Sequence, residues 1–289
     1  MQGFELIPFE ERTADTLLVV CGSSQLTHAE CDAILSHIDS GGGTLLFLSA
    51  HDIDIAASWE PVQTGDDTLI AALADYGISF RPEFAADIAN VPTELEESVP
   101  DSPTAVPERK LINYPLWISV MPQAHALRGL TLFWASPLTL LDNAEPYLQS
   151  SQYAWLHAPH AGTNPFLVEQ MDSHTETLTL AAQIHAANKK CIVVGDQYCL
   201  HTQAIRYLNG LGQGDFRNFM FLADALLELN GEQDLLALKN RTAYSTLLYK
   251  QSEQLEFSAT VHTAQFILFI AVPVLYALCY ILALALRRR

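Results

Sequence analysis

Basic residues are scarce in this sequence. Its 289 residues include 15 lysines and arginines against 33 aspartates and glutamates, which gives a formal net charge of −18. Proteins bind phosphate backbones through clustered Lys and Arg side chains, and here those residues are mostly scattered singly. The composition therefore argues against a nucleic-acid partner, and it disfavours close contact between the acidic part of the chain and anionic lipid headgroups.

Cysteine is also sparse, and its spacing forms no pattern. The five cysteines include no CxxC pair that would indicate a zinc site, and they are too far apart for a dense disulfide framework. We accordingly expect no metal and no other cofactor. The cysteines do not decide whether the protein lies in an oxidising or a reducing compartment. The cysteines are Cys21, Cys31, Cys191, Cys199 and Cys279.

No export signal is visible at the start of the chain. Residues 1–20 contain neither a basic region nor the apolar core of a signal peptide. By contrast, residues 264–286 contain no charged residue, and three arginines follow at 287–289. About 23 helical residues extend roughly 34 Å, which is enough to cross a hydrocarbon core of about 30 Å. This run predicts one transmembrane helix in a lipid bilayer, preceded by a linker at 250–263.

The charges beside the span predict its orientation. Glu253 and Glu256 precede it and the arginines at 287–289 follow it, so the positive-inside rule places the tail in the cytoplasm. Residues 1–249 then form an extracytoplasmic domain of a single-pass protein of the inner (cytoplasmic) membrane. Two explanations of the missing signal remain. We favour an upstream span, in a longer protein or in another chain that supplies a missing N-terminal region; the alternative is a tail-anchored protein that faces the cytosol.

The composition of the span predicts a second role besides anchoring. Small residues let two helices approach closely, and a tyrosine hydroxyl in lipid needs a hydrogen-bond partner. We therefore expect one face of the span to contact a partner helix. The expected contact residues are Ala264, Ala271, Pro273, Leu275, Tyr276 and Tyr280.

Hydrophobic patterns before the span predict an α/β domain. Residues 16–21 and 44–49 are short apolar runs typical of buried strands. Between them, Thr27 and Glu30 form a capping box that begins a helix, and the glycines at 41–43 end it. A strand, a helix and a strand within about 35 residues make a βαβ unit, which implies a parallel sheet.

The later elements continue this alternation, with one interruption. Residues 81–109 contain five prolines, many carboxylates and little periodicity, and we expect an acidic, proline-rich excursion or flap there. We expect Leu17–Cys21, Leu45–Leu48 and Ile192–Val194 to be adjacent central strands, because near-continuous apolar runs need cover on both faces. The remaining predicted helices span residues 67–76 and 215–230, and the remaining predicted strands span 78–80, 130–136, 177–186, 191–197 and 235–239.

Several predicted strands end in polar residues. Open α/β sheets bind ligands outside the carboxyl ends of their strands. Ordinary turns and caps use the same residue types, so that interpretation also stays open. The candidate ligand-binding residues are Gly22, Ser23, Ser24, His51, Asp52, Asp54, Gly195, Asp196 and Gln197.

Other motifs carry weaker signals, and we expect no catalytic residue. Cys21 ends a predicted strand, but Val19 stands where a nucleophile elbow has its first glycine. His157 and His160 have a spacing seen in metal sites, yet Pro159 precludes a regular helix and no third ligand is marked. Three tryptophans could line a ligand groove, although we expect them in the core: Trp117, Trp134 and Trp155.

Several stretches, taken in order, resemble the auxiliary subunit of gliding-motility-type ABC transporters. This family is membrane-anchored and has an extracytoplasmic domain. Two features depart from the family pattern: its N-terminal span and further α/β region are missing, and Cys21 stands where relatives tend to have a small apolar residue. The matching stretches are residues 15–49, NYPLWI at 113–118, LTLFWASPL at 130–138, IVVGDQYCL at 192–200, residues 216–241 and the C-terminal span.

The resemblance implies a fold and a set of partners. The fold is a flavodoxin-like or glutamine-amidotransferase-like α/β domain with flanking helices, and the partners are an ABC permease and its ATPase subunit. It implies a non-enzymatic accessory subunit that binds a substrate or partner outside the cytoplasm and docks on the permease. Two alternatives remain open: a membrane-tethered amidase-like or hydrolase-like enzyme, and a scaffold that binds only proteins.

Overall fold

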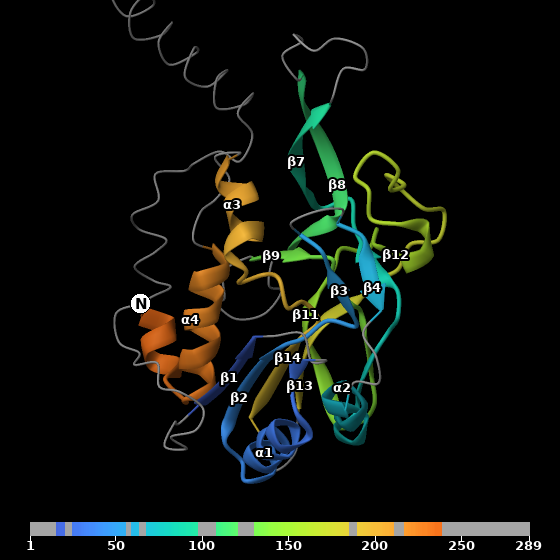
Figure 1. The fold of residues 1–289 in the computed structure, drawn as a ribbon. Coiled ribbons are helices and arrows are strands. Elements are labelled where there is room, and N and C mark those ends of the chain that lie inside the picture. Colours follow the sequence, from blue (N-terminus) through green and yellow to red (C-terminus); the bar gives the residue numbers. More distant parts are fainter. Residues whose placement is uncertain are drawn as a thin grey trace, which may run out of the picture. The chain divides into compact units, whose positions relative to one another are not determined.

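The computed structural model describes residues 16–20, 25–55, 59–63, 68–97, 108–120, 130–184, 190–210 and 217–238 (Figure 1). The chain divides into two units, Met1–Ala237 and Leu238–Arg289, and every described residue except Leu238 belongs to the first. The predicted span at 264–286 and its flanks lie outside the described residues. Among the described helices, none has both the length and the apolar character needed to cross a membrane.

A seven-stranded mixed sheet forms the centre of the first unit. β1, β2 and β14 are parallel neighbours, which confirms that the three predicted strands are adjacent. β13, β10, β5 and β11 join by antiparallel pairing, so the all-parallel prediction is wrong, and β1 lies at an edge of the sheet. The strands, in spatial order, are β1 (Thr16–Val20), β2 (Gly43–Phe47), β14 (Cys191–Val194), β13 (Thr179–Ile184), β10 (Leu138–Leu140) and β5 (Ile78–Phe80), with β11 (Ala144–Gln149) beside β13.

The short connection between β13 and β14 explains why these two strands pair antiparallel. β13 ends at Ile184 and β14 begins at Cys191. A parallel crossover needs a dozen or more residues, so strands joined this closely can pair only antiparallel. The register accordingly runs in opposite directions, with Ile184 beside Cys191 and Ala181 beside Val194.

Helices cover both faces of the parallel strands. In β2, Leu46 faces the cluster that contains α1 (His28–Asp39) and α2 (Thr68–Leu73), whereas Leu45 and Phe47 face the cluster that contains α4 (Arg217–Leu229). All three side chains are fully buried. The strand is buried at every position because each of its faces meets a helix layer.

The ends of the helices agree with the sequence signals. Thr27 and Glu30 form the predicted capping box at the start of α1. α2 continues into the short 3-10 helix η3 (Ala74–Tyr76), which ends at Gly77 with a φ of 87°. A left-handed φ of this kind suits glycine, which has no Cβ to clash.

Two other sequence predictions are wrong. The segment 81–109 contains β6 (Phe84–Ala86) and β7 (Asn90–Glu97), and β7 forms an antiparallel hairpin with β8 (Glu108–Val120). Pro92 is tolerated because β7 pairs on one side only. Residues 233–238 are helical, so the strand predicted at 235–239 is wrong over its described part, 235–238.

Smaller elements complete the unit. β9 (Leu130–Phe133) pairs with β8 and makes a three-stranded sheet with the β7–β8 hairpin (Figure 1). The other elements are β3 (His51–Ile53) paired with β4 (Pro61–Gln63), β12 (Trp155–His157) paired with β6, the 3-10 helix η4 (Pro159–Ala161), and α3 (Thr202–Gly210).

An aromatic cluster fills the core beside β8 and β9. The ring of Trp59 lies 5.3 Å from that of Trp117 and 5.5 Å from that of Trp134, centroid to centroid. Trp134 Nε1 donates to the hydroxyl of Tyr114 at 2.8 Å. Trp117, Trp134 and Trp155 are all buried, which confirms the prediction that they belong to the core.

Gly195 provides a test of how tightly the main sheet packs. A Cβ at this position would lie 2.1 Å from the carbonyl oxygen of Ser136, a backbone atom that cannot turn aside. We expect Gly195→Ala to lower the free energy of unfolding by about 3 kcal/mol or more, measured by urea denaturation of the purified chain. Gly42→Ala is the matched control, because the atoms nearest to its new methyl group belong to the His37 ring, a side chain that can rotate. A loss at Gly195 no larger than that at Gly42 would contradict this packing.

Candidate functional site

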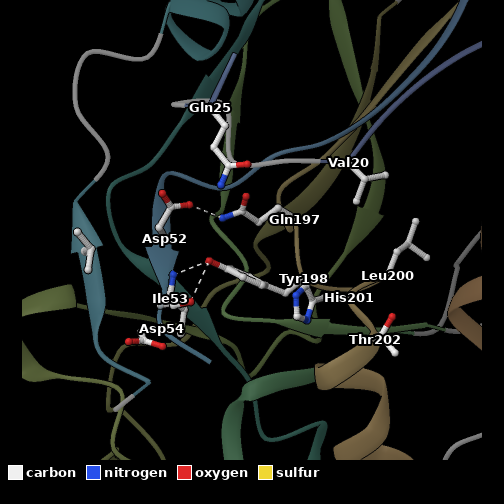
Figure 2. A pocket seen from close by; sticks show the side chains of 11 residues that line it. Val20, Gln25, Asp52, Ile53, Asp54, Gln197, Tyr198, Leu200, His201 and Thr202 are labelled. Carbon is white, nitrogen blue, oxygen red and sulfur yellow. Dashed lines mark hydrogen bonds between the residues drawn. The ribbon is translucent and has the colours of Figure 1, made fainter. Parts of the chain in front are cut away.

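A pocket of about 680 Å³ lies at the carboxyl ends of the parallel strands (Figure 2). It is lined by the end of β1, by β3 and β4, by the loop after β14 and by the first residue of α3. Ligands bind at this edge of open α/β sheets, and volumes of this order are typical of small-molecule sites. The lining residues are Val20, Gln25, Asp52, Ile53, Asp54, Val62, Gln197, Tyr198, Leu200, His201 and Thr202.

The structure brings three of the predicted residues together at this pocket. Gln197 Nε2 donates to Asp52 Oδ1 at 2.8 Å and to the carbonyl of His51 at 3.4 Å. The backbone N–H of Gln197 donates to the hydroxyl of Ser49 at 3.0 Å, which ties the loop after β14 to the end of β2. Asp54 lines the same pocket from the residue after β3.

Tyr198 closes one side of the pocket. Its hydroxyl accepts a hydrogen bond from the backbone N–H of Ile53 and lies 3.4 Å from the Ile53 carbonyl. Burial raises the pKa of the phenol to about 12, so it stays protonated at neutral pH. The His201 ring packs edge-on against Tyr198 at 6.2 Å. Neither residue was among the predicted candidates, although Tyr198 directly follows the predicted Gln197 and His201 comes four residues after it.

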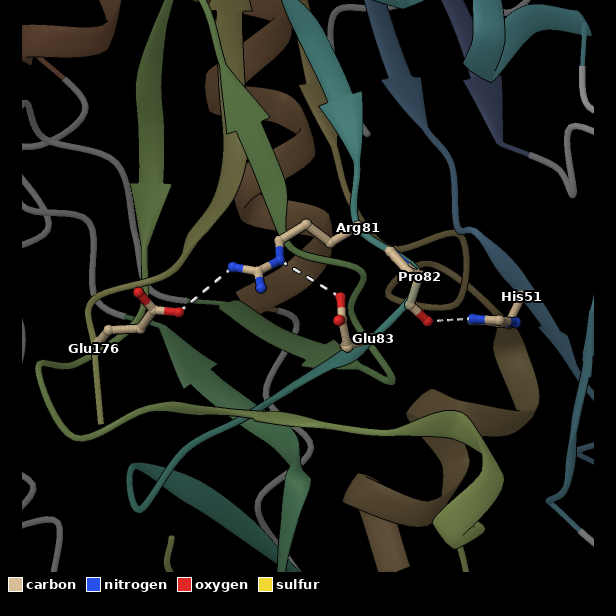
Figure 3. A network of polar contacts seen from close by, with 5 residues as sticks. All are labelled: His51, Arg81, Pro82, Glu83 and Glu176. Carbon is tan, nitrogen blue, oxygen red and sulfur yellow. Dashed lines mark hydrogen bonds and ion pairs between the residues drawn. The ribbon is translucent and has the colours of Figure 1, made fainter. Parts of the chain in front are cut away.

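His51 lies outside the pocket. Its Nε2 contacts the carbonyl of Pro82 at 2.6 Å, and its ring packs against Phe84 at 5.0 Å (Figure 3). In the same network Arg81 forms ion pairs with Glu83 at 3.5 Å and with Glu176 at 3.4 Å. These contacts hold the segment between β5 and β6. His51 therefore packs against this segment and does not line the pocket.

Gly195 and Asp196 do not line the pocket either. Asp196 is fully buried, and its Oδ2 accepts the backbone N–H of Phe133 in β9 at 2.7 Å while its Oδ1 accepts that of Tyr198 at 2.5 Å. Burial raises the pKa of this carboxyl group to about 7, and the backbone hydrogen bonds oppose part of that shift. The other predicted residues, Gly22, Ser23 and Ser24, and Cys21 beside them, lie outside the described residues.

The remaining candidates, the histidine pair and the cysteine after the pocket loop, show no arrangement typical of a metal or catalytic site among the described residues. His157 is buried, and its Nε2 contacts the carbonyl of Gly162 at 2.7 Å, while His160 is exposed. Within the described ranges, no three His, Cys, Asp or Glu side chains come together as a metal site would require. Burial raises the pKa of the Cys199 thiol, which keeps it protonated and therefore a poor nucleophile.

Comparisons with known proteins identify a family for most of the chain. A family model described as "ABC-type uncharacterized transport system" matches residues 2–221. A search of curated proteins finds no match. A solved structure titled "mmIFT52 N-terminal domain" shares 14% sequence identity at a TM-score of 0.43, over 75% of this chain and 77% of that chain. The family match confirms the resemblance to an auxiliary ABC transporter subunit, and its range includes every pocket-lining residue.

Asp196 predicts a pH dependence of stability. Its folded pKa of about 7 lies above the ordinary value of 3.8, so between these values the folded protein holds a proton that the unfolded chain has released. The contribution of this group is fully present below about pH 4 and is lost as pH rises toward about 7, by on the order of a few kcal/mol. We expect urea denaturation of Asp196→Asn to lack this slope, whatever its absolute stability. The control Asp142→Asn, at an exposed turn, should retain it; an identical slope in Asp196→Asn would contradict the assignment.

Proposed function

We propose a function from the premise that this chain belongs to the family described as an ABC-type transport system, as an auxiliary protein of that system. It serves as a non-enzymatic, membrane-anchored accessory subunit that binds a substrate or partner in its α/β domain and docks on the permease. The single observation that carries this proposal is the family match over residues 2–221, which spans the sheet, the β7–β8 hairpin and the pocket.

The groups around the pocket support binding over reaction. Asp52 and Gln197 hold one another, and the hydroxyl of Tyr198 is engaged with the backbone of Ile53. Tyr198 is protonated at neutral pH, as a phenol ordinarily is, and burial raises its pKa further, to about 12. Burial also raises the pKa of the adjacent Cys199 thiol, which does not line the pocket. Groups that are held and protonated in this way orient a ligand and do not attack it.

The C-terminal sequence supports the membrane anchor. The uncharged run at 264–286 is long enough to span a bilayer, and the arginines at 287–289 favour a cytoplasmic tail. In this arrangement the α/β domain is extracytoplasmic, at the inner membrane. The permease and its ATPase subunit are the partners, and the span contacts a permease helix through Ala271, Pro273 and Tyr276.

Replacement of the span by polyleucine tests the docking proposal. Polyleucine over 264–286 should still insert into the membrane, because insertion depends on apolar length. It should lose the permease, because it lacks the small residues and tyrosines that we assign to the contact. The measurement is the amount of permease and ATPase that co-purifies with the full chain in mild detergent. Co-purification at the wild-type level would show that the span only anchors the chain in the membrane and is not needed for binding the permease.

Protease treatment of intact spheroplasts tests the orientation. We expect the α/β domain to be degraded while a tag placed after Arg289 is spared. The control is a cytoplasmic protein, which should stay intact until the membrane is broken. Protection of the domain in intact spheroplasts, with removal of the tag, would establish the tail-anchored alternative instead.

A further inference from the structure

Three large apolar side chains are exposed along one short loop. The loop joins β12 to β13, and Figure 1 shows it in yellow-green, projecting beside β8. Phe166 is 47% exposed, Leu167 is 74% exposed and Met171 is 65% exposed. Residues 166–171 span at most about 20 Å, so these side chains share one small area of the surface. Single exposed apolar residues are ordinary, whereas a group of large ones marks a site of interaction.

Buried contacts anchor this loop to the body of the domain. Thr163 donates its hydroxyl to the carbonyl of Trp59, and its own carbonyl accepts the hydroxyl of Tyr114. Pro165 and Val168, which flank the first two exposed residues, are both buried. Because the flanking side chains occupy the interior, the apolar side chains between them are directed outward. Their exposure is therefore built into the fold.

The charges on the same loop are negative. Residues 158–176 contain no lysine or arginine, and their carboxylates are Glu169, Asp172 and Glu176. Glu169 and Glu176 are exposed, and Asp172 is partly exposed. Arg81 pairs with Glu176 at 3.4 Å and partly neutralises that carboxylate, which is the farthest of the three along the chain from the apolar residues. A partner therefore meets apolar side chains with carboxylates beside them.

This combination of groups selects one class of partner. Segments that lie on anionic lipid use lysine and arginine beside their apolar residues, and this loop has none. A second copy of the chain would bring carboxylates against carboxylates, and like charges across an interface oppose association. A protein groove with apolar walls and basic side chains at its rim complements both features of the loop.

We propose that Phe166, Leu167 and Met171 form a docking surface, which inserts into an apolar groove of a partner protein whose rim carries lysine or arginine. None of the three residues lines the pocket, so this surface is separate from the candidate ligand site. It adds a contact outside the bilayer to the one proposed for the span. Under the proposed function the partner is the permease, and only that identification rests on the proposed function.

Photocross-linking in native membranes tests the surface. p-Benzoylphenylalanine replaces Phe166 in the full chain, and a control chain carries it instead at Leu141, which is 62% exposed and follows β10. We expect a product with another protein from position 166 and none from position 141, with the joined peptide identified by mass spectrometry. A product with lipid alone, a product with a second copy of this chain, or no product from position 166 would each overturn the proposal.

Substitutions beside the cross-linker show whether the apolar side chains bind. Leu167→Asp with Met171→Asp should lower the yield from position 166 at least about tenfold, because carboxylates would enter an apolar groove. The control Leu141→Asp with Leu235→Asp adds the same charge at other exposed leucines, and its yield should stay within about twofold of wild type. Equal losses in the two double variants would assign the effect to added charge and contradict the proposal.

The basic rim has a test of its own. Glu169→Gln with Asp172→Asn removes two charges but keeps polar acceptors, so the yield should fall at least about threefold, and added salt should lower the wild-type yield. Asp75→Asn with Asp142→Asn removes the same charge from exposed positions on other elements and should leave the yield within about twofold of wild type. A yield that responds neither to salt nor to the loop variant would overturn the partner that we name.

The identity of the joined protein separates this proposal from the accessory-subunit proposal. A permease peptide supports both. A different protein, whose product is lost in Leu167→Asp with Met171→Asp, supports the docking surface and counts against the permease as its partner. Co-purification of the permease without any product from position 166 supports the accessory subunit and overturns the docking surface.

Discussion

Two buried side chains take the place of a strand along the outer edge of β9. Thr131 donates its N–H to Asn218 Oδ1 at 2.8 Å and accepts from Asn218 Nδ2 at 2.8 Å, while Phe133 donates to Asp196 at 2.7 Å. The other edge of β9 pairs with β8. An unpaired backbone N–H in this interior would cost a few kcal/mol, so β9 can be buried only because α4 and the loop after β14 supply these groups.

The same constraint positions the pocket. Asp196 also accepts the N–H of Tyr198, and Asn218 Nδ2 also donates to the carbonyl of Cys199 at 2.6 Å, so the loop after β14 is held from both the sheet and α4. With Asp196 directed into the core, the next side chain, Gln197, meets Asp52 at the pocket. Two consecutive polar residues therefore have different roles: Asp196 accepts hydrogen bonds from a buried strand, and Gln197 lines the pocket.

Much of the parallel half of the fold could be predicted from the sequence because its signals are local. The capping box at Thr27 and the apolar runs of β2 and β14 each act within a few residues. The wrong predictions concern segments whose structure depends on contacts outside the segment itself. β7 is a strand because the next strand, β8, pairs with it, and 233–238 is helical with Leu236 buried. The antiparallel pairing of β13 was readable from the short connection to β14, a signal that the pattern of strands alone does not contain.

At the site, strand ends indicated the right edge of the sheet but not the direction of each side chain. Asp52, Asp54 and Gln197 line the pocket, whereas His51 and Asp196 face inward. The direction depends on which neighbour needs a hydrogen bond, and that neighbour, Phe133 for Asp196 and Pro82 for His51, belongs to another element. Tyr198 escaped prediction because its hydroxyl is fixed by the backbone of Ile53, 145 residues earlier in the chain.

The pairing of β2 with β14 has a consequence for how the protein is made. Ser49 and Gln197, which are joined at the end of these two strands, lie 148 residues apart. At a synthesis rate of about 5–20 residues per second, the apolar edge of β2 waits roughly 7–30 seconds for its partner strand. Contacts this distant in sequence also close slowly, because a long loop must lose entropy first. During that interval β1 and β2 form at most a two-stranded ribbon with an open edge, the state of the chain in which a chaperone or export factor has the most surface to protect.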